Sequence, residues 1–266
     1  MVAAKFEPSE LAVKLDGKAA LVTGSATGIG RSTALGLAKR GCHVVINYTK
    51  SQAEAEETVR TIRAAGSRAL LYRCDVSDDK AVRAMVVACE REFGRLDVLV
   101  NAAGTTDFAP PEDLEAMTGE VWDRIFSVNV RGTFLVTRAA APLLRRSGEG
   151  AVVNLASVAG LRPAAQAIPY AASKAAIVNM TVSLARVLAP EVRVNAVAPG
   201  WMKGRWMEAA LGDRYNSLME RRAQRTPLRR VATPEDVAQT ILSLVEHNDF
   251  VTGQVLVVDG GYSIAS

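Results

Sequence analysis

Short apolar runs, rich in β-branched residues, alternate along the chain with longer segments of helical period. The apolar runs predict seven strands, at 18–23, 43–47, 69–74, 98–101, 151–155, 192–197 and 255–258. Continuous apolar runs of this kind are typical of strands covered on both faces. The longer segments predict helices at 29–39, 53–65, 80–93, 121–144, 170–188 and 234–246.

This alternation predicts an α/β fold, a single-domain Rossmann-like doubly wound parallel sheet of about seven strands with helices on both faces. The sequence contains no linker, low-complexity tract or internal repeat that would divide it. We expect residues 1–16 to form an N-terminal arm and residues 17–266 to form one domain.

Composition narrows the class of protein. With 49% hydrophobic and 23% charged residues, the chain is typical of a globular protein rather than a disordered one. No stretch approaches the roughly 18–20 apolar residues of a membrane span, and the N-terminus lacks the apolar core of a signal peptide. The cysteines Cys42, Cys74 and Cys89 lack metal-ligand spacing, so we expect buried thiols, a cytoplasmic location and no metal. The net charge is +4, but the basic residues are scattered along the chain, so neither nucleic acid nor membrane is expected as a partner.

A glycine-rich turn follows the first predicted strand. Residues 23–30 read TGSATGIG and lead directly into a helix. Glycines let the backbone approach a pyrophosphate, and the helix N-terminus offers free N–H groups to it. The sequence therefore predicts a dinucleotide site, with cofactor contacts from Gly24, Ser25, Thr27, Gly28, Ile29 and Gly30.

The end of the second strand bears on the choice of cofactor. Residues Asn47, Tyr48, Thr49 and Lys50 occupy the place where NAD-selective sites usually carry an acid, and no acid follows until Glu54. This favours NADP(H) and leaves NAD(H) open. After the third strand, Asp75 and Val76 are predicted to contact the adenine, although a turn role for the Asp75 carboxylate is an alternative.

The segment PYAASK brings together a tyrosine and a lysine. Tyr170 and Lys174 are four residues apart at the start of a predicted helix, so they share one face of it. A nearby ammonium favours the phenolate, which proton exchange near neutral pH requires. Ser157 follows a predicted strand, where open α/β sheets bind ligands, and Asn129 is a polar residue within an apolar helical stretch.

Together these motifs make the chain resemble the short-chain dehydrogenase/reductase family over residues 18–262. The turn matches the family's TGxxxGIG, residues 101–104 read NAAG, residues 199–200 read PG and residues 258–261 read VDGG. Asn129, Ser157, Tyr170 and Lys174 match the family's catalytic tetrad. The subgroup that the chain resembles most is that of the 3-oxoacyl-acyl-carrier-protein reductases.

The resemblance implies hydride transfer between a nicotinamide and a carbonyl or secondary alcohol carbon. Tyr170 is expected to exchange the proton, Lys174 to bind the nicotinamide ribose, Ser157 to hold the substrate oxygen and Asn129 to support a proton relay. Further cofactor contacts are expected from Tyr170 and Lys174 themselves and from Asn101, Ala102, Gly104, Pro199, Gly200 and Met202. Position 202 departs from relatives that carry threonine soon after the PG pair, and Thr27 stands where NADP-dependent relatives often have arginine.

The substrate is left more open. A lid is expected at about 201–222, where Trp201, Met202, Trp206 and Met207 offer apolar surface. NADPH-dependent reduction of a ketone or 3-oxoacyl thioester is favoured; the alternatives are an NAD-dependent sugar, polyol or steroid-type alcohol dehydrogenase and, more remotely, a non-catalytic dinucleotide-binding regulator. An acyl-carrier protein stays open as a partner. The resemblance implies two basic docking positions for it: Arg186 fills one, but Pro142 stands at the other, which weakens this expectation. Relatives imply a homotetramer, or failing that a dimer.

Overall fold

The computed structural model describes residues 13–110, 112–162 and 167–265 of the chain. These residues form a seven-stranded sheet in the order β3-β2-β1-β4-β5-β6-β7, with every neighbouring pair parallel. The strands are β1 (Ala19–Thr23), β2 (His43–Tyr48), β3 (Ala69–Arg73), β4 (Val98–Asn101), β5 (Gly150–Leu155), β6 (Val192–Pro199) and β7 (Val255–Val258). The predicted α/β class and all seven predicted strands are confirmed, with ends that differ by at most two residues.

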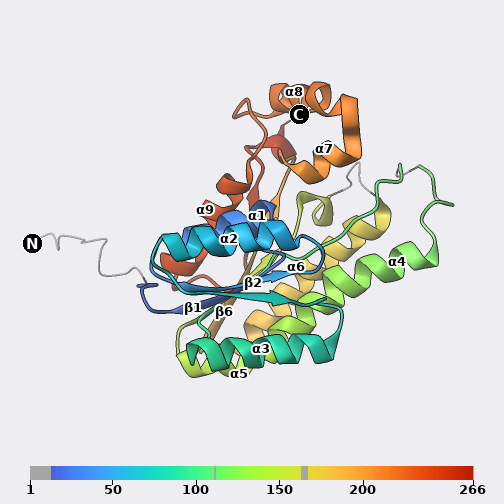
Figure 1. The fold of residues 1–266 in the computed structure, drawn as a ribbon. Coiled ribbons are helices and arrows are strands. Elements are labelled where there is room, and N and C mark those ends of the chain that lie inside the picture. The colour runs from blue at the N-terminus through green and yellow to red at the C-terminus, as the bar shows by residue number, and fades with distance from the viewer. Residues whose placement is uncertain (1–12, 111, 163–166, 266) are drawn as a thin grey trace, which may run out of the picture.

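Helices cover both faces of the sheet, which explains why the strands are apolar throughout (Figure 1). One face carries α1 (Gly28–Ala38), α2 (Gln52–Ala64) and α9 (Pro234–Glu246), which enclose one apolar core with the sheet. The other face carries α3 (Asp79–Phe93), α5 (Thr133–Ser147) and α6 (Ile168–Leu188), which enclose a second core. The α9 helix begins with a capping box formed by Thr233 and Asp236. Its first residue is Pro234, a residue type that favours the start of a helix.

The topology creates a switch point between β1 and β4. After β3 at one edge, the chain returns to place β4 on the opposite side of β1. Ligands of open α/β sheets bind at such a point, outside the carboxyl ends of the strands. Here the ends of β1 and β4 are joined by the Thr23 hydroxyl, which accepts the N–H groups of Ala102 and Ala103 at 3.0 Å each.

The helix predicted at 121–144 is not continuous. It consists of α4 (Gly119–Phe126), one π-helical segment (Ser127–Gly132) and α5. The π-helical segment ends at Gly132, which packs closely against Val76. A Cβ on Gly132 would lie 2.7 Å from the Val76 Cγ2. A close approach to the loop after β3 therefore coincides with the irregular turn.

Two helices lie where the sequence predicted only a lid. After β6, the chain forms α7 (Arg205–Leu211) and α8 (Tyr215–Arg225), which stand together at one end of the molecule (Figure 1). No side chain of α7 is buried, and only Met219 is buried in α8. This segment therefore rests on the domain without entering either core.

The start of the domain differs from the predicted boundary at residue 16. Leu15 is buried within the first core, and the Val13 N–H donates to the Glu246 carbonyl at 2.8 Å. Residues 13–16 thus belong to the domain rather than to an arm, while the rest of the predicted arm, 1–12, lies outside the described residues. In the part of the chain that is described, no helix has the length and apolarity needed to cross a membrane.

A buried carboxylate fixes the beginning of β1 next to the beginning of β4. Asp97 is 2% exposed, accepts the Ala19 N–H at 2.9 Å and receives two hydrogen bonds from Arg95 at 2.7 and 2.8 Å. We predict that Asp97→Ala lowers the free energy of unfolding by about 3 kcal/mol, because it leaves the Ala19 N–H and the Arg95 guanidinium without their partner. Urea unfolding at a fixed protein concentration measures this loss.

Glu149→Ala is the matched control. Glu149 pairs with Lys18 at 2.9 Å near the same end of the sheet, but its side chain is 67% exposed. Exposed pairs contribute little, so we expect a change of at most about 0.5 kcal/mol. An equal decrease in the free energy of unfolding in the two variants would contradict the prediction that the buried Asp97 contributes more stability than the exposed Glu149.

Candidate active site

The glycine-rich turn is packed too closely to hold larger residues. A Cβ on Gly30 would lie 2.5 Å from the Gly24 carbonyl oxygen, and one on Gly24 would lie 2.9 Å from the Ala103 Cα. Gly24 also has a φ of +61°, which favours glycine. Beyond it, Thr27 and Gly28 are exposed, and among the described residues no side chain caps the start of α1. The first N–H groups of α1 are therefore available to a phosphate, and the turn fits a dinucleotide.

Two residues of the predicted cofactor set are instead used inside the protein. The Ser25 hydroxyl donates to the Val22 carbonyl at 2.7 Å and accepts the Asn47 N–H at 3.0 Å. The Asn47 amide accepts the Gly24 N–H at 3.1 Å and donates to the Cys74 carbonyl at 3.0 Å. These buried side chains hold the turn against the end of β2, so they shape the cofactor site without facing it.

The groups that face solvent after β2 are Thr49 and Lys50. Tyr48 is buried, whereas Thr49 and Lys50 are exposed, and the Thr49 carbonyl accepts from Arg73 at 3.2 Å. The first acid beyond them, Glu54, pairs with Arg205 of α7 at 3.1 Å. The end of β2 therefore presents a cation and a hydroxyl, and its nearest following carboxylate is engaged elsewhere.

The turn after β3 combines an exposed and a buried residue. One oxygen of Asp75 accepts the N–H and the hydroxyl of Ser77 at 2.9 and 2.7 Å, so the alternative turn role is present. The Asp75 side chain nevertheless stays exposed, whereas Val76 is 4% exposed and packs against Gly132. Val76 thus anchors this turn, and its adenine contact stays a prediction.

Buried amides connect the strands to the helices behind the site. Asn101, at the end of β4, donates to Thr137 at 3.0 Å and to the Asn154 side chain at 2.9 Å. Asn154 donates in turn to Thr181 of α6 at 3.0 Å. The Asn101 Oδ1 has no hydrogen-bond partner among the described residues. The NAAG motif is therefore held from behind, and the exposed Gly104 is its most accessible member.

Ser157, Tyr170 and Lys174 meet at the carboxyl end of β5. The Lys174 ammonium donates to the Leu155 carbonyl at 2.6 Å and lies 5.6 Å from the centre of the Tyr170 ring. Ser157, two residues after the end of β5, is buried, accepts the Ala159 N–H at 3.2 Å and lies close enough to the Tyr170 hydroxyl to act on its pKa. The helix α6 comes this close because Gly160 has no side chain: a Cβ there would lie 2.5 Å from the Lys174 carbonyl carbon.

Burial acts on both titrating groups of this cluster. Lys174 is 4% exposed, and the cost of burying its charge lowers the pKa of its ammonium to about 8. Burial raises the pKa of Tyr170 above its usual value, and the hydrogen bond to Ser157 partly opposes that rise. The protein side chains alone therefore do not produce the low tyrosine pKa that the Tyr170–Lys174 spacing suggested.

Asn129 joins this cluster through the π-helical segment. Its amide donates to the Thr105 carbonyl at 2.9 Å and to the Ser173 hydroxyl at 3.0 Å, and it accepts the Thr105 N–H at 2.7 Å. Ser173 donates to the Tyr170 carbonyl at 2.7 Å. Asn129 thereby ties the loop after β4 to the helix that carries Tyr170 and Lys174. Its role in a proton relay stays a prediction.

The remaining predicted cofactor residues lie after β6. The Gly200 N–H donates to the Val258 carbonyl at 3.1 Å, and Gly200 packs against Asp259, whose Cβ would lie 2.5 Å from an added Cβ. Met202 forms a β-bridge with Ala232 and is partly buried. The chain is thus fixed as it leaves Pro199, just before it turns into α7.

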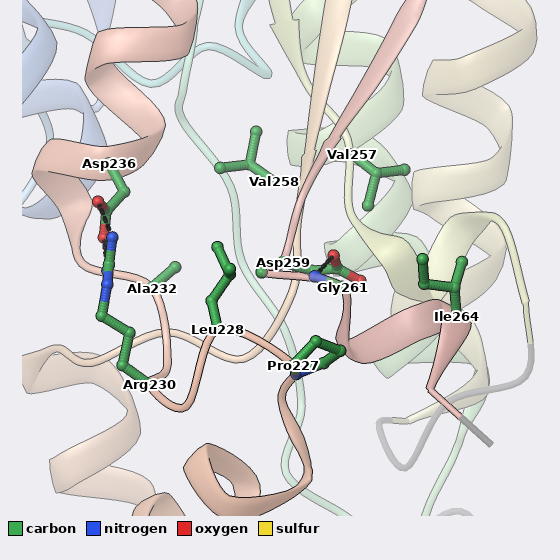
Figure 2. A pocket seen from close by; sticks show the side chains of 11 residues that line it. Pro227, Leu228, Arg230, Ala232, Asp236, Val257, Val258, Asp259, Gly261 and Ile264 are labelled. Carbon is green, nitrogen blue, oxygen red and sulfur yellow. Dashed lines mark hydrogen bonds and ion pairs between the residues drawn. The ribbon is translucent and has the colours of Figure 1, made fainter.

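A surface pocket of about 580 Å³ lies beside the edge strand β7, and its lining includes Val258, Asp259 and Ala232, the contacts of Gly200 and Met202 (Figure 2). Figure 2 shows Arg230 paired with Asp236 at one side of the pocket and Val257 and Ile264 at the other. The Arg230 Nη2 donates to the Asp236 Oδ1 at 2.7 Å. None of the predicted catalytic residues lines this pocket. Among the residues with described positions, no three His, Cys, Asp or Glu side chains cluster as metal ligands.

Sequence reasoning missed two residues that position the site. Ser173 links Asn129 to Tyr170, and Gly160 sets the distance between Ser157 and α6. Ser173 follows Tyr170 by three positions, so the same helical spacing that paired Tyr170 with Lys174 also indicated it. Gly160 carried no comparable signal, because a glycine after a strand is more often a simple turn residue.

Comparison with known proteins places more than nine-tenths of the chain among oxidoreductases. A family model described as "Enoyl-(Acyl carrier protein) reductase" matches residues 24–263. The chain is 48% identical to the granaticin polyketide synthase putative ketoacyl reductase 2 of Streptomyces violaceoruber, over 91% of this chain and 94% of that one. It is 39% identical to the 3-oxoacyl-acyl-carrier-protein reductase FabG of Staphylococcus aureus, over 92% and 97%. Among solved structures, a gluconate 5-dehydrogenase of Burkholderia cenocepacia in complex with NADP and tartrate matches with a TM-score of 0.86 and 33% identity, over 95% and 98%.

The lowered pKa of Lys174 generates a prediction about stability. The unfolded chain keeps this lysine protonated up to its ordinary pKa of 10.5, whereas the folded chain releases the proton near pH 8. Between these values the unfolded state binds more protons, so this group makes the free energy of unfolding rise with pH; below about pH 8 its burial costs about 3 kcal/mol. We predict that Lys174→Met stabilises the cofactor-free protein by about 2 kcal/mol at pH 7, after the lost hydrogen bond to Leu155 is counted.

The difference between wild-type and Lys174→Met unfolding curves from pH 7 to 10 isolates this effect. Burial raises the pKa of Cys74 to about 11 and that of Cys89 to about 12, so these thiols make the free energy of unfolding fall as pH rises. Because both proteins contain these thiols, their contribution cancels in the difference. The expected difference shrinks as pH rises through 8 to 10. A variant that is less stable at pH 7, with an unchanged pH slope, would contradict the assignment of a costly buried charge.

Proposed function

Since the chain belongs to the short-chain dehydrogenase/reductase family, we propose that it reduces the ketone of a 3-oxoacyl thioester with NADPH. The observation that carries this proposal is the meeting of Ser157, Tyr170 and Lys174 at the end of β5, beside the turn that fits a dinucleotide. The thioester is supported by the two ketoacyl and 3-oxoacyl reductases to which the chain is similar over more than nine-tenths of its length.

When bound, a nicotinamide cofactor would supply the hydride for the carbonyl carbon, and side chains of the protein would supply the proton. The Tyr170 hydroxyl donates its proton to the carbonyl oxygen, while the Ser157 hydroxyl hydrogen-bonds the same oxygen and fixes its position. Lys174 lies beside the Tyr170 ring, where its positive charge favours the phenolate that remains after proton transfer. Asn129 hydrogen-bonds both the loop after β4 and the helix α6, and so fixes the position of one relative to the other around these groups.

The preference for NADPH rests on the end of β2. Thr49 and Lys50 are exposed there, and a lysine attracts the 2′-phosphate that distinguishes NADP from NAD. Glu54, the first acid to follow, is paired with Arg205 and so repels a phosphate less than a free carboxylate does. The exposed first turn of α1, with Thr27 and Gly28, is suited to the pyrophosphate.

The decisive measurement is the initial rate of NADPH consumption with a 3-oxoacyl thioester, set beside plain ketones, polyols and sugars and repeated with NADH. We predict the highest kcat/KM for the thioester with NADPH. Tyr170→Phe is expected to lower kcat by at least about a thousandfold, because the proton donor is lost, while the Kd for NADPH changes by less than about threefold.

Tyr72→Phe serves as the control, since Tyr72 lies on β3 and its hydroxyl makes no hydrogen bond among the described contacts. It should keep wild-type rates. Near-normal turnover in Tyr170→Phe would overturn the catalytic assignment. Faster oxidation of a polyol with NAD would favour an alcohol dehydrogenase, and NADPH binding without any turnover would favour a regulator.

We also propose that the enzyme is a homotetramer. One apolar surface lies on α5 and α6, where Phe134, Val182 and Val187 are 43%, 52% and 65% exposed. A second lies along β7, the sheet edge whose pocket is lined by Leu228, Val257 and Ile264. Exposed apolar surfaces of this kind mark contact sites, and two separate self-complementary contacts generate a closed tetramer.

We predict that Val182→Asp converts the tetramer into a smaller species, because it buries a charge at the contact between copies. Light scattering after gel filtration at micromolar concentration measures the mass. Val87→Asp is the control, a matched exchange at a 62% exposed position of α3, and should leave the mass unchanged. A monomeric wild-type protein would contradict the tetramer directly.

A further inference from the structure

Three aromatic rings from distant parts of the chain meet beside the reacting groups. The Trp206 ring of α7 packs edge-to-face against the Tyr170 ring, with 6.4 Å between their centres. The Phe108 ring, from the loop after β4, packs edge-to-face against Trp206 at 5.7 Å. Tyr170 is thus the inner member of an aromatic cluster whose two outer members face the surface.

The segments that carry the outer rings are each held by an ion pair. Arg205, next to Trp206, pairs with Glu54 of α2 at 3.1 Å. Asp107, next to Phe108, pairs with Arg124 of α4 at 2.8 Å, and Arg124 also donates to the Thr106 carbonyl at 3.1 Å. Each ring is therefore next to a residue that connects its segment to a neighbouring helix.

Both outer rings keep a large apolar surface in contact with water. Trp206 is 49% exposed and Phe108 is 50% exposed, although each already packs against another ring. Exposed aromatic surface in contact with a reacting residue is surface that a bound substrate covers. Since Trp206 contacts Tyr170 and Phe108 contacts Trp206, the part of the substrate next to its ketone reaches Trp206 first and Phe108 beyond it.

We propose that Phe108 and Trp206 form a stacking wall that selects substrates whose ketone is attached to a flat, rigid ring over those with a flexible acyl chain. This inference rests on the proposed function and names the acyl group that the site prefers. A flat ring stacks on an aromatic side chain or packs against its edge, a geometry that a saturated chain does not offer. A rigid ring also loses less conformational freedom on binding than a chain with several rotatable bonds.

The test compares two thioesters of N-acetylcysteamine with nine acyl carbons each, 3-oxo-3-phenylpropanoyl and 3-oxononanoyl. With NADPH, Trp206→Leu is expected to lower kcat/KM about tenfold for the phenyl compound and by a smaller factor for the linear one, so that their ratio shifts at least fivefold. Trp206→Phe, which retains a ring, should keep most of the wild-type ratio. Using this ratio cancels the different intrinsic reactivities of the two ketones.

A binding measurement without turnover accompanies the rates. Calorimetric titration of the protein with 2-naphthol should show affinity that weakens about tenfold in Trp206→Leu. Phe250→Leu is the control, because Phe250 is fully exposed and lies in the turn before β7, outside the cluster. It should leave both the ratio and the naphthol affinity unchanged.

The outcomes separate this inference from the proposed function. Equal losses on both thioesters in Trp206→Leu, or no loss on either, would overturn the stacking wall while leaving thioester reduction intact. Turnover of the linear thioester together with no detectable naphthol binding would do the same. If neither thioester is reduced although NADPH binds, the proposed function fails, and the naphthol titration still decides whether the wall binds flat rings.

Discussion

A single buried cation governs the arrangement of the site. The Lys174 ammonium is enclosed at the end of β5, where its hydrogen bond to the Leu155 carbonyl ties α6 to the sheet. Burying this charge is unfavourable enough to bring its pKa to about 8. Such a cost is characteristic of functional sites, because a mutation that removed the charge would stabilise the fold and abolish the chemistry. The closeness required for this contact is also what excludes a side chain at Gly160 and fixes Ser157 against Tyr170.

The rest of the polar interior keeps that arrangement from shifting. Asn101 and Asn154 link β4 and β5 to each other and to the helices behind them, and Asn129 links the loop after β4 to α6 through Ser173. Buried hydrogen-bonded networks of this kind rigidify a structure, and of these three amides only Asn101 keeps an oxygen, its Oδ1, without a partner among the described residues. The elements that carry the glycine-rich turn, the predicted proton donor and the substrate-holding serine therefore behave as one unit.

The sequence predicted the strands well because helices cover both faces of the sheet, so each strand is apolar along its whole length and stands out as a continuous run. It indicated Tyr170, Lys174 and Ser157 because helical spacing and strand ends are local properties. It could not tell whether a polar residue at a strand end faces a ligand or the protein, and Asn47 is turned inward. The π-helical turn at Asn129 also escaped prediction; it coincides with the close approach of Gly132 to Val76, which are distant in sequence.

The helices α7 and α8 were missed for a related reason that bears on substrate choice. Helix α7 has only seven residues, too few to show a clear helical period in the sequence, and α8 buries only Met219. Their segment is held to the domain by surface contacts such as the pair between Arg205 and Glu54, which contribute little stability each. Changes in α7 therefore disturb the fold and the buried cation little, while they alter the ring that Trp206 places against Tyr170. Because the proton-handling groups sit on the rigid unit and the aromatic wall sits on this marginal one, substrate preference can vary independently of the reaction itself.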